Sequence, residues 1–548
     1  MVYIYAKHSE LNKYIGKKLT VQEIENTLID LGMDIKGKSD EKDIELKIEI
    51  TAEKMEFVSS IGIARAIKHY LEIEKEIETY EIKKGKNTII VDRSVQKVRP
   101  KIVGAIIRDF EVTEENLEEI IKIQEKIHDS FGRNRKKISI GIYPVKKIEF
   151  PIIYKAEKPE KIKFRPLESE VEMNGNEILE KHETGKKYAH LINESDVYPV
   201  LIDSKNQILS MPPIINSYET GRVVPGKCDL FIDCTGYNLT HLDNILKVIV
   251  TTLLEMDGKA ESVIVDYDEE KYELNLDNYK DEIDIDFVND WIGIKINKEE
   301  AEKLLKRMCY KVIKSKENKF EIEIPPYRSD VWHDVDIADD IARAYGYNNI
   351  IPKIPEISSS GEHLPKSLKR EEISKNLVGM GFLELYTYML TSTDIQYTKM
   401  KIKEKKCVKI IDSAEEGINT VRTLILPENL VALNINRKCG YPQKVFENGF
   451  VIEEDENEEH VCVCIAEPKS NYTKIKEVFD MLVKMNGWGI TLKEKEYNFL
   501  IRGRSASILY KEKEIGFIGE IHPEILNNFG LIVPVSCFEI NIKEIIEE

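Results

Sequence analysis

The chain reads PPYRSDVWHDVDIADDIARAYGY over residues 325–347, and this stretch predicts the end of a strand followed by a helix. On the helix, Asp336, Asp339 and Asp340 are spaced i, i+3 and i+4, so their carboxylates share one face. Asp330 lies just upstream, where the chain can fold back over that face. Four carboxylates with no cysteine and no evident histidine ligand form an all-oxygen set that suits a hard cation such as Mg²⁺.

A simpler interpretation of the same residues is a solvated helix start. Aspartate is favoured there because the positive end of the helix dipole stabilises a negative side chain. The spacing by itself leaves both interpretations open.

A second copy of this unit lies near the start of the chain. Tyr14–Leu19 (YIGKKL) is followed about 280 residues later by Trp291–Ile296 (WIGIKI), and Ile63–Ala66 (IARA) is followed by the identical Ile341–Ala344. A helix and an alternating strand separate the two matches in each copy. We therefore expect two helix–strand–helix modules that arose as a duplicated domain, and not a solenoid of short repeats.

The two copies differ at the acidic positions. Where the second copy has its four aspartates, the first has Ala52, Val58, Ile61 and Gly62. The shared fold therefore does not require the aspartates, which favours a role specific to the second copy. We expect the four aspartates to hold Mg²⁺ and the first module to bind no metal.

Length and composition define the broad class. The 548 residues allow three to five domains, and a net charge of −18 excludes a general nucleic-acid coat protein. The eight cysteines are scattered without a CxxC pair, so neither a zinc site nor a disulfide framework is indicated. No apolar leader and no 18-residue apolar run occur, so we expect a cytoplasmic protein without a membrane segment.

The order of periodic segments predicts an α+β, multidomain chain. We expect the first module at 1–75, a β-rich domain at 88–268, the second module at 278–354, and a last domain at 365–548. The last domain combines antiparallel strands with flanking helices. No phosphate-binding glycine loop and no GxSxG or HExxH motif is present.

One part of the β-rich domain has the pattern of a small-molecule pocket. Tyr198–Asp203 predicts a buried strand, Ile208–Ser217 is apolar with hydroxyl and amide groups, and Asp229–Gly236 predicts a strand that ends in polar residues. Apolar walls with a few polar groups are typical of a ligand site. Two ordinary strand ends would give the same pattern, and the residues alone leave this open.

A basic run, Arg133–Lys137 (RNRKK), follows an expected helix over 114–130. Such runs are usually solvated turns, and they can also contact a polyanion.

Taken together, these segments resemble the beta subunit of phenylalanine–tRNA ligase in its short archaeal form, over nearly the whole chain. The acidic stretch 325–340 resembles that family's B5 domain, and the first module resembles its B1 domain. Leu209–Ser217 resembles its B3/B4 domain. Gly381–Glu384 and Phe517–Pro523 resemble its terminal domain, which is built like a class II synthetase core. The RNA-binding OB domain and anticodon-binding tail of the longer bacterial subunits have no counterpart here, so direct anticodon binding is not expected.

The resemblance implies a heterotetramer of two alpha and two beta subunits that charges the phenylalanine tRNA. ATP and phenylalanine would be activated on alpha, and the terminal domain of beta would keep the synthetase fold without its chemistry. The B3/B4-like domain would hydrolyse mischarged Tyr-tRNA. By resemblance the editing pocket contains Leu201 as a wall, Ser210 to orient substrate or water, and Asp233 and Thr235 to meet the polar ends of the amino acid. Because no nucleophile–base pair is evident, we expect attack by a positioned water.

Two other functions remain in view. The chain could be a non-catalytic scaffold or tRNA-binding subunit whose pocket has decayed, and hydrolysis of Tyr-tRNA separates this from editing. A free-standing hydrolase is less favoured, because the last domain resembles one built for a partner.

Overall fold

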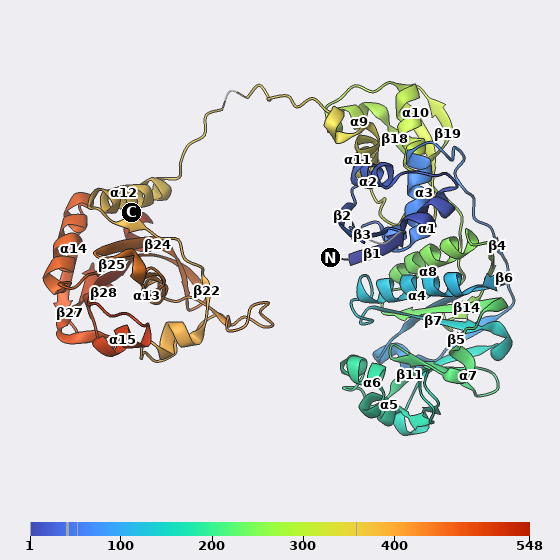
Figure 1. Ribbon diagram of the computed structural model, residues 1–548, viewed down its shortest axis with the longest axis horizontal. Helices are drawn as coiled ribbons and strands as arrows, with labels where there is room; N and C mark the ends of the chain where they lie inside the picture. The colour runs from blue at the N-terminus through green and yellow to red at the C-terminus, as the bar shows by residue number, and fades with distance from the viewer. Residues whose placement is uncertain (1, 40–42, 52, 358, 548) are drawn as a thin grey trace. The chain divides into compact units, whose positions relative to one another are not determined.

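The computed structural model describes residues 2–39, 43–51, 53–357 and 359–547. It divides into two compact units, Met1–Ile354 and Pro355–Glu548, and each is described by itself (Figure 1). The boundary falls between the second module and the last domain. Within the described ranges, no helix combines the length and apolar character that crossing a membrane requires.

The N-terminal unit contains two copies of one α+β module. The first copy consists of β1 (Val2–Lys7), α1 (His8–Ile15), α2 (Val21–Asp30), β2 (Asp34–Lys38), β3 (Glu45–Ile50) and α3 (Ser60–Tyr70). The second consists of β18 (Tyr279–Asp284), α9 (Ile285–Ile292), α10 (Lys298–Arg307), β19 (Lys311–Lys316), β20 (Lys319–Ile324) and α11 (Asp334–Tyr345). The sheet orders, β1-β3-β2 and β18-β20-β19, are equivalent, so the duplication holds in three dimensions.

Matching local contacts support the duplication. Asn12 on α1 binds the backbone of Leu19 through its side-chain oxygen and nitrogen, at 2.8 and 3.1 Å. Asn289 on α9 binds Ile296 in the same way, at 2.9 and 3.1 Å. The helix–strand–helix expectation was incomplete, because each module also has an opening strand and a second hairpin strand. The hairpin strands β2 and β19 are mostly exposed, so no apolar alternation marked them.

Between the modules in sequence lies the β-rich domain. Its strands are β4 (Ile82–Lys83), β5 (Thr88–Val91), β6 (Lys101–Val112), β7 (Ile138–Pro144), β8 (Ile152–Glu157), β9 (Lys163–Phe164), β10 (Met173–Asn174), β11 (Tyr198–Ile202), β12 (Ile208–Met211), β13 (Ile215–Asn216), β14 (Gly226–Gly236), β15 (Lys259–Ser262), β16 (Ile264–Asp266) and β17 (Lys271–Tyr272). Its helices are α4 (Glu114–Asp129), α5 (Gly175–Lys181), α6 (Glu183–Tyr188), α7 (Tyr218–Gly221) and α8 (Leu239–Leu254).

Three layers build this domain. A five-stranded sheet of order β4-β15-β6-β14-β7 has α4 and α8 on one side (Figure 1). Its other face packs on a seven-stranded sheet of order β13-β12-β11-β8-β5-β16-β17 through apolar side chains such as Ile106, Leu201 and Phe231. The strand β14 pairs with both β6 and β7 and is buried over most of its length. Polar residues on β14 are therefore held between the layers.

The C-terminal unit is a seven-stranded sheet of order β21-β24-β25-β29-β28-β27-β26. Its strands are β21 (Leu383–Glu384), β24 (Gln443–Glu453), β25 (Glu456–Ala466), β26 (Ile490–Glu494), β27 (Leu500–Tyr510), β28 (Lys513–Ile521) and β29 (Val535–Asn541), with a separate pair β22 (Leu390–Thr391) and β23 (Thr420–Val421). Its helices are α12 (Pro365–Gly379), α13 (Leu426–Ile435), α14 (Tyr472–Asn486), α15 (Pro523–Asn528) and α16 (Lys543–Glu547). All pairings in the large sheet are antiparallel except β21 with β24.

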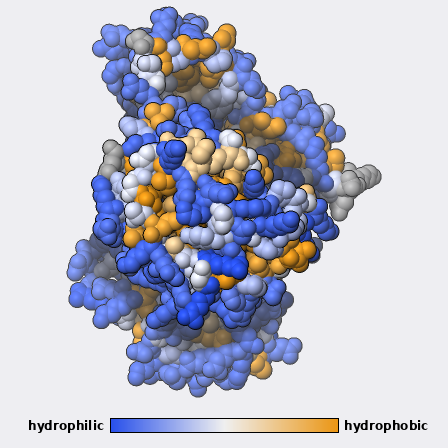
Figure 2. All heavy atoms as spheres, turned by 90° about the vertical axis from the view of Figure 1, so that its left-hand side faces the viewer, coloured by the Kyte–Doolittle hydropathy of each residue, from blue (hydrophilic) through white to orange (hydrophobic). Residues whose placement is uncertain are grey.

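Two separate apolar cores cover the two faces of this sheet. Residues of α13 and α15 belong to one core, and residues of α12 and α14 belong to the other. Figure 2 views this unit from the side of α14 and shows hydrophobic patches set among hydrophilic side chains. The outer side of α14 contributes Met481 and Met485, which are about half exposed.

Candidate functional site

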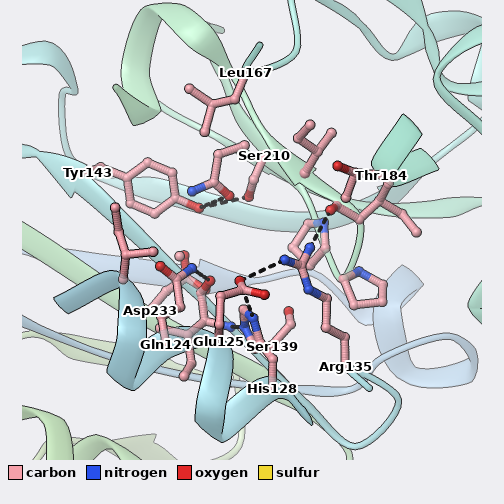
Figure 3. A pocket seen from close by; sticks show the side chains of 18 of the residues that line it. Gln124, Glu125, His128, Arg135, Ser139, Tyr143, Leu167, Thr184, Ser210 and Asp233 are labelled. Atoms are coloured by element: carbon pink, nitrogen blue, oxygen red, sulfur yellow. Dashed lines mark hydrogen bonds and ion pairs between the residues drawn. The ribbon is translucent and has the colours of Figure 1, made fainter. Parts of the chain in front are cut away.

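A cavity of about 250 Å³ lies in the β-rich domain, between α4, β7, β12 and β14 (Figure 3). Polar side chains reach it from each of these elements and from the turn after α4. The residues that matter for its chemistry are Gln124, Glu125, His128, Arg135, Ser139, Gly141, Tyr143, Ser210, Asn216 and Asp233. A cavity thus lies in the region where the sequence suggested a pocket, and its wall is strongly polar.

Ser210 and Asp233, two of the four residues expected in the pocket, line this cavity. Ser210 is on β12 and accepts a hydrogen bond of 3.0 Å from the Tyr143 hydroxyl. Asp233 is on β14, directly opposite Gly141 of β7, and its Oδ1 is buried without a hydrogen-bond partner. Both side chains are only 2% exposed.

Gly141 makes room for these polar groups. A Cβ atom at this position would lie 2.2 Å from the Tyr143 hydroxyl and 2.5 Å from Asp233 Oδ1. Any side chain here would therefore push the two groups apart or fill the cavity.

Burial determines the acidity of Asp233. It raises the pKa of this carboxyl to about 7, because the charged form loses its hydration, while Tyr143 and the Arg99 guanidinium act in the opposite direction. Near neutral pH the group therefore exchanges readily between an acid and a carboxylate, as a group that handles protons must.

The other two expected residues lie behind the cavity wall. Thr235 is fully buried, and its hydroxyl shares a hydrogen bond of 3.0 Å with Ser139, which does line the cavity. Leu201 is also fully buried in the core between the sheets, opposite Ser210 in the pairing of β11 with β12. The structure thus places Thr235 and Leu201 as supports of lining residues.

Sequence reasoning missed a charged group on the other side of the cavity. Glu125 accepts a hydrogen bond of 3.0 Å from Arg135, and it contacts His128 Nδ1 at 3.2 Å. Hydrogen bonding from His128, together with the Arg135 charge, lowers the pKa of Glu125 to about 2. The spacing of Glu125 and His128 on the expected helix, next to the basic run, was the available signal.

His128 is not free to act as a base in the cavity. Its Nε2 accepts the backbone N–H of Ile140 at 2.9 Å, and burial lowers the pKa of the ring. Since neither this histidine nor a serine–histidine pair is available, the cavity is suited to binding and positioning, with Asp233 as the group that can accept a proton.

The acidic helix α11 has a different arrangement from the one expected. Asp330 and Asp340 face Lys54 of the first module, with Nζ–Oδ distances of 2.8 and 3.1 Å. Arg328 also binds both carboxylates, and it meets Asp330 through Nε and Nη2 at 2.8 Å each. Tyr310 donates a hydrogen bond of 2.7 Å to Asp340.

The remaining two aspartates point elsewhere. Asp336 accepts the backbone N–H groups of Trp332 and His333, at 2.8 Å each, and so caps its own helix. Asp339 binds Arg343 at 2.9 Å and also accepts the Tyr347 hydroxyl.

The expectation that the four aspartates converge on Mg²⁺ is therefore corrected. In the part of the chain that the structure describes, no three acidic, histidine or cysteine side chains are grouped to hold a metal ion. Lys54 and Arg328 supply the positive charge that the buried carboxylates need, so the residues present do not fit the ion. In the first module, Val58 and Ile61 are buried in the apolar core, Gly62 is buried, and Ala52 lies outside the described residues.

Comparison with known proteins identifies the family. The model of the "tRNA synthetase B5 domain" matches residues 282–347, and that of the "Phenylalanyl tRNA synthetase beta chain CLM domain" matches residues 350–542. The phenylalanine–tRNA ligase beta subunit of Pyrococcus horikoshii is 36% identical over 98% of both chains. That of Archaeoglobus fulgidus is 35% identical over 94% of this chain and 93% of its own. The chain belongs to the phenylalanine–tRNA ligase beta subunit family. It is thus a subunit of an aminoacyl-tRNA synthetase.

A solved structure agrees with this assignment. The crystal structure of an N-terminal fragment of the beta subunit from Pyrococcus horikoshii matches with a TM-score of 0.60 and 37% sequence identity. The match covers 63% of this chain and the whole of that fragment. The B5 match falls within the second module, so family membership and the internal duplication describe the same residues.

Proposed function

We propose that this chain works with an alpha subunit, as two alpha and two beta chains, in a cytoplasmic ligase that attaches phenylalanine to its tRNA. The names of its relatives support the reaction and the presence of a second kind of subunit. ATP and Mg²⁺ would be used on alpha. This chain would supply assembly, contacts to the tRNA and hydrolytic editing of mischarged Tyr-tRNA.

The need for editing follows from chemistry. Tyrosine is phenylalanine with one added hydroxyl, and an apolar pocket cannot strongly reject an added hydroxyl. A second site that binds the hydroxyl with polar groups can select the wrong product and hydrolyse its ester. The energy for discrimination then comes from hydrogen bonds that phenylalanine cannot make.

The polar cavity suits that task. Its volume, about 250 Å³, lies just below the range of roughly 300–1,000 Å³ typical of pockets for drug-sized ligands, so it suits a single amino-acid side chain and not a nucleotide. Asp233, Tyr143 and Ser210 offer acceptors and donors on one side, and Glu125 with Arg135 offers charges on the other. Thr235 acts through Ser139, and Leu201 supports the strand that carries Ser210.

The hydrolysis needs only a positioned water. The water oxygen bonds to the ester carbonyl carbon, the bond from that carbon to the ribose oxygen breaks, and the ribose oxygen leaves with a proton that the water gives up. Asp233, with a pKa of about 7, is placed to hold this proton in passing. Positioning of this kind accounts for a large part of many enzymatic rates.

One observation carries this proposal, namely the buried, unpartnered Oδ1 of Asp233 that faces the cavity next to Tyr143. In the complex with alpha, Asp233→Ala should abolish hydrolysis of Tyr-tRNA while charging with phenylalanine stays near normal. Asp229→Ala is the matched control, because Asp229 lies on the same strand outside the cavity and binds Arg108 on the surface.

The outcomes separate the two candidate functions. Hydrolysis at the parent rate in Asp233→Ala would make the cavity structural and favour the scaffold. Loss of both hydrolysis and charging, together with a lower melting temperature, would instead assign Asp233 to the fold.

The alpha contact is proposed for the exposed segment between β21 and β22. Tyr386 and Tyr388 are 96% and 87% exposed, and Leu383 and Leu390 on the flanking strands are more than half exposed. Aromatic side chains this exposed, beside a sheet edge, are typical of a protein interface. Changing both tyrosines to Glu should abolish co-purification with alpha, whereas Ile29→Glu on α2 should not. If the double variant still co-purified with alpha, the interface would have to lie elsewhere on this chain.

A further inference from the structure

The basic run after α4 forms a turn beside the polar cavity, and one of its residues, Arg135, lines the cavity. His128 and Ser139, on either side of the run, both line the cavity, and so does Arg135 within it (Figure 3). The Arg135 guanidinium points inward, where it binds Glu125 and donates a hydrogen bond of 2.8 Å to the Ile214 carbonyl. The run is therefore part of the site and not a remote surface loop.

The backbone of this turn is left-handed. Arg133, Asn134 and Arg135 have φ angles of 48°, 53° and 65°, in a region that residues other than glycine adopt rarely. Three such residues in succession are unfavourable unless other contacts hold them. Strained backbone of this kind is concentrated at binding and catalytic sites.

Buried Arg99 holds the turn in place. Its Nη1 binds the Lys136 carbonyl at 3.1 Å, and its Nη2 binds the Arg135 carbonyl at 3.4 Å. The same guanidinium binds the hydroxyl of Thr235 at 2.9 Å and its carbonyl at 2.7 Å. Arg99 is 2% exposed, so a buried cation is used to fix the turn to the strand that carries Asp233.

The turn presents three cations to solvent. Arg133, Lys136 and Lys137 are exposed, and in the described part of the chain no carboxylate pairs with any of them. The chain as a whole has a net charge of −18, so the positive charge of this turn is local and does not reflect the overall charge. Glu168, which also lines the cavity, is negatively charged and repels an anion. The turn is therefore the side of the cavity that attracts an anion.

We propose that Arg133, Lys136 and Lys137 bind the phosphates of the single-stranded RNA end whose terminal ester enters the cavity. This inference rests on the proposed editing function and names the residues that deliver its substrate. The ester is attached to the last ribose, so the preceding phosphates must lie just outside a cavity that admits only the amino acid. The three exposed cations share their turn with Arg135, which lines the cavity, so they are near enough to meet those phosphates.

Counterion release gives the size of the effect. Each cation that contacts a single strand contributes about 0.7 to the slope of log affinity against log salt. Three contacts amount to about 2 in the slope, or on the order of 20-fold in affinity between 50 and 200 mM salt.

The test uses the full chain in complex with alpha and compares four proteins. These are the parent, R133Q/K136Q/K137Q, the charge-conserving R133K/K136R/K137R, and the control K83Q/K84Q/K86Q. The control removes three exposed lysines that also lack an ion pair among the described residues but lie outside the cavity. Two quantities are measured for each: the affinity for uncharged phenylalanine tRNA against salt, and KM and kcat for hydrolysis of Tyr-tRNA.

The expected result is specific to the turn. R133Q/K136Q/K137Q should bind tRNA at least tenfold more weakly at 50 mM salt, with a salt slope lower by about 2. Its KM should rise while kcat at saturating RNA stays near the parent value. The charge-conserving variant and the lysine control should behave like the parent.

Two results would overturn the inference. The first is an unchanged tRNA affinity and salt slope in R133Q/K136Q/K137Q. The second is an equal loss of tRNA affinity in the lysine control, which would show that only the net charge of the chain matters. Editing and RNA binding fail separately. If the parent does not hydrolyse Tyr-tRNA but the turn variant still loses affinity, the editing function fails and the RNA contact stands. If the parent hydrolyses Tyr-tRNA and the turn variant binds RNA as tightly as the parent, the editing function stands and the RNA contact fails.

Discussion

The ammonium group of Lys54 lies 2.8 Å from the carboxylate of Asp330, although 276 residues separate them in the chain. Lys54 belongs to the first module and Asp330 to the second. Both side chains are more than nine-tenths buried. The duplicated modules are thus joined by an ion pair in which the first copy supplies the cation and the second supplies the anion.

The surrounding groups keep this pair charged. Burial alone would raise the pKa of Asp330, but the Arg328 and Lys54 charges outweigh it, so the pKa is lowered. Burial likewise opposes the charge on Lys54, and Asp340 and Asp330 outweigh it, so that pKa is raised. An acid whose pKa is lowered in the folded state stabilises the fold above its unfolded pKa of about 4. A lysine whose pKa is raised in the folded state stabilises the fold below its unfolded pKa of about 10. The network is therefore fully formed between these limits.

Lys54→Met should destabilise the N-terminal unit strongly at neutral pH. Removing one partner of a buried pair leaves an uncompensated charge and typically costs about 3–5 kcal/mol. The loss is expected near the lower end, because Arg328 still neutralises part of the acidic charge. Thermal and denaturant unfolding of the full chain measure it, and the difference from the parent should shrink below about pH 4.

Lys36→Met is the control for this substitution. Lys36 pairs with Asp34 at 2.5 Å, but it is 41% exposed, and such surface pairs contribute about 0–1 kcal/mol. Equal losses for the two variants would show that burial of the Lys54 pair is not what stabilises the modules.

Asp340→Asn distinguishes the ion pair from a metal site. We expect it to lower the melting temperature by the same amount in excess Mg²⁺ and in a chelator, because Lys54, Arg328 and Tyr310 already occupy the carboxylate. If Mg²⁺ raised the melting temperature of the parent but not that of Asp340→Asn, the metal site would be supported after all.

These residues show how far the sequence could lead. The spacing of Asp336, Asp339 and Asp340 correctly placed them on one helix, but spacing does not reveal which cation faces the helix. Lys54 is distant in sequence, and only the folded duplication brings it near. The polar residues at the ends of apolar strands suggested a ligand pocket, and the resemblance to the family placed Ser210 and Asp233 in it.

Other parts of the site depend on tertiary contacts that no local pattern records. Thr235 and Leu201 lie one layer behind the cavity because of the pairing and stacking of two sheets. Tyr143 reads as an ordinary strand residue, and only the approach of β12 places its hydroxyl against Ser210. The duplication itself was visible, because repeated segments keep their apolar spacing over many residues.

Gly141→Ala should block editing and leave charging intact. The added methyl would lie 2.2 Å from the Tyr143 hydroxyl and 2.5 Å from Asp233 Oδ1, well inside van der Waals contact. Overpacking of this kind costs about 1–3 kcal/mol, so the variant should fold with a lower melting temperature. Hydrolysis of Tyr-tRNA and charging with phenylalanine are measured on the same complex. Gly489→Ala, where a Cβ meets no atom within 4 Å, serves as control.

Normal hydrolysis in Gly141→Ala would place the substrate outside the space between Tyr143 and Asp233. The cavity would then need a different point of entry for the amino acid.

The pH dependence of Asp233 provides a test of both stability and activity. The folded pKa of about 7 lies above the unfolded value of about 4. Since the folded state holds the proton more tightly, this group favours folding at low pH, and its contribution is lost as the pH rises from about 4 to 7. Asp233→Asn, which cannot ionise, should therefore gain melting temperature relative to the parent across this interval, with no further gain above about pH 7.

Activity should change in the opposite direction over the same range. If the carboxylate holds the proton that water gives up, kcat for hydrolysis of Tyr-tRNA should rise with pH and level off above about 7, after subtraction of the uncatalysed rate. Asp233→Asn should show neither the rise nor the activity, while it is the more stable protein at pH 8. An active Asp233→Asn with the parent pH profile would assign the titration to another group. A variant that is both inactive and less stable at pH 8 would contradict the effect of burial on this carboxyl, because removing a buried charge would then have weakened the fold.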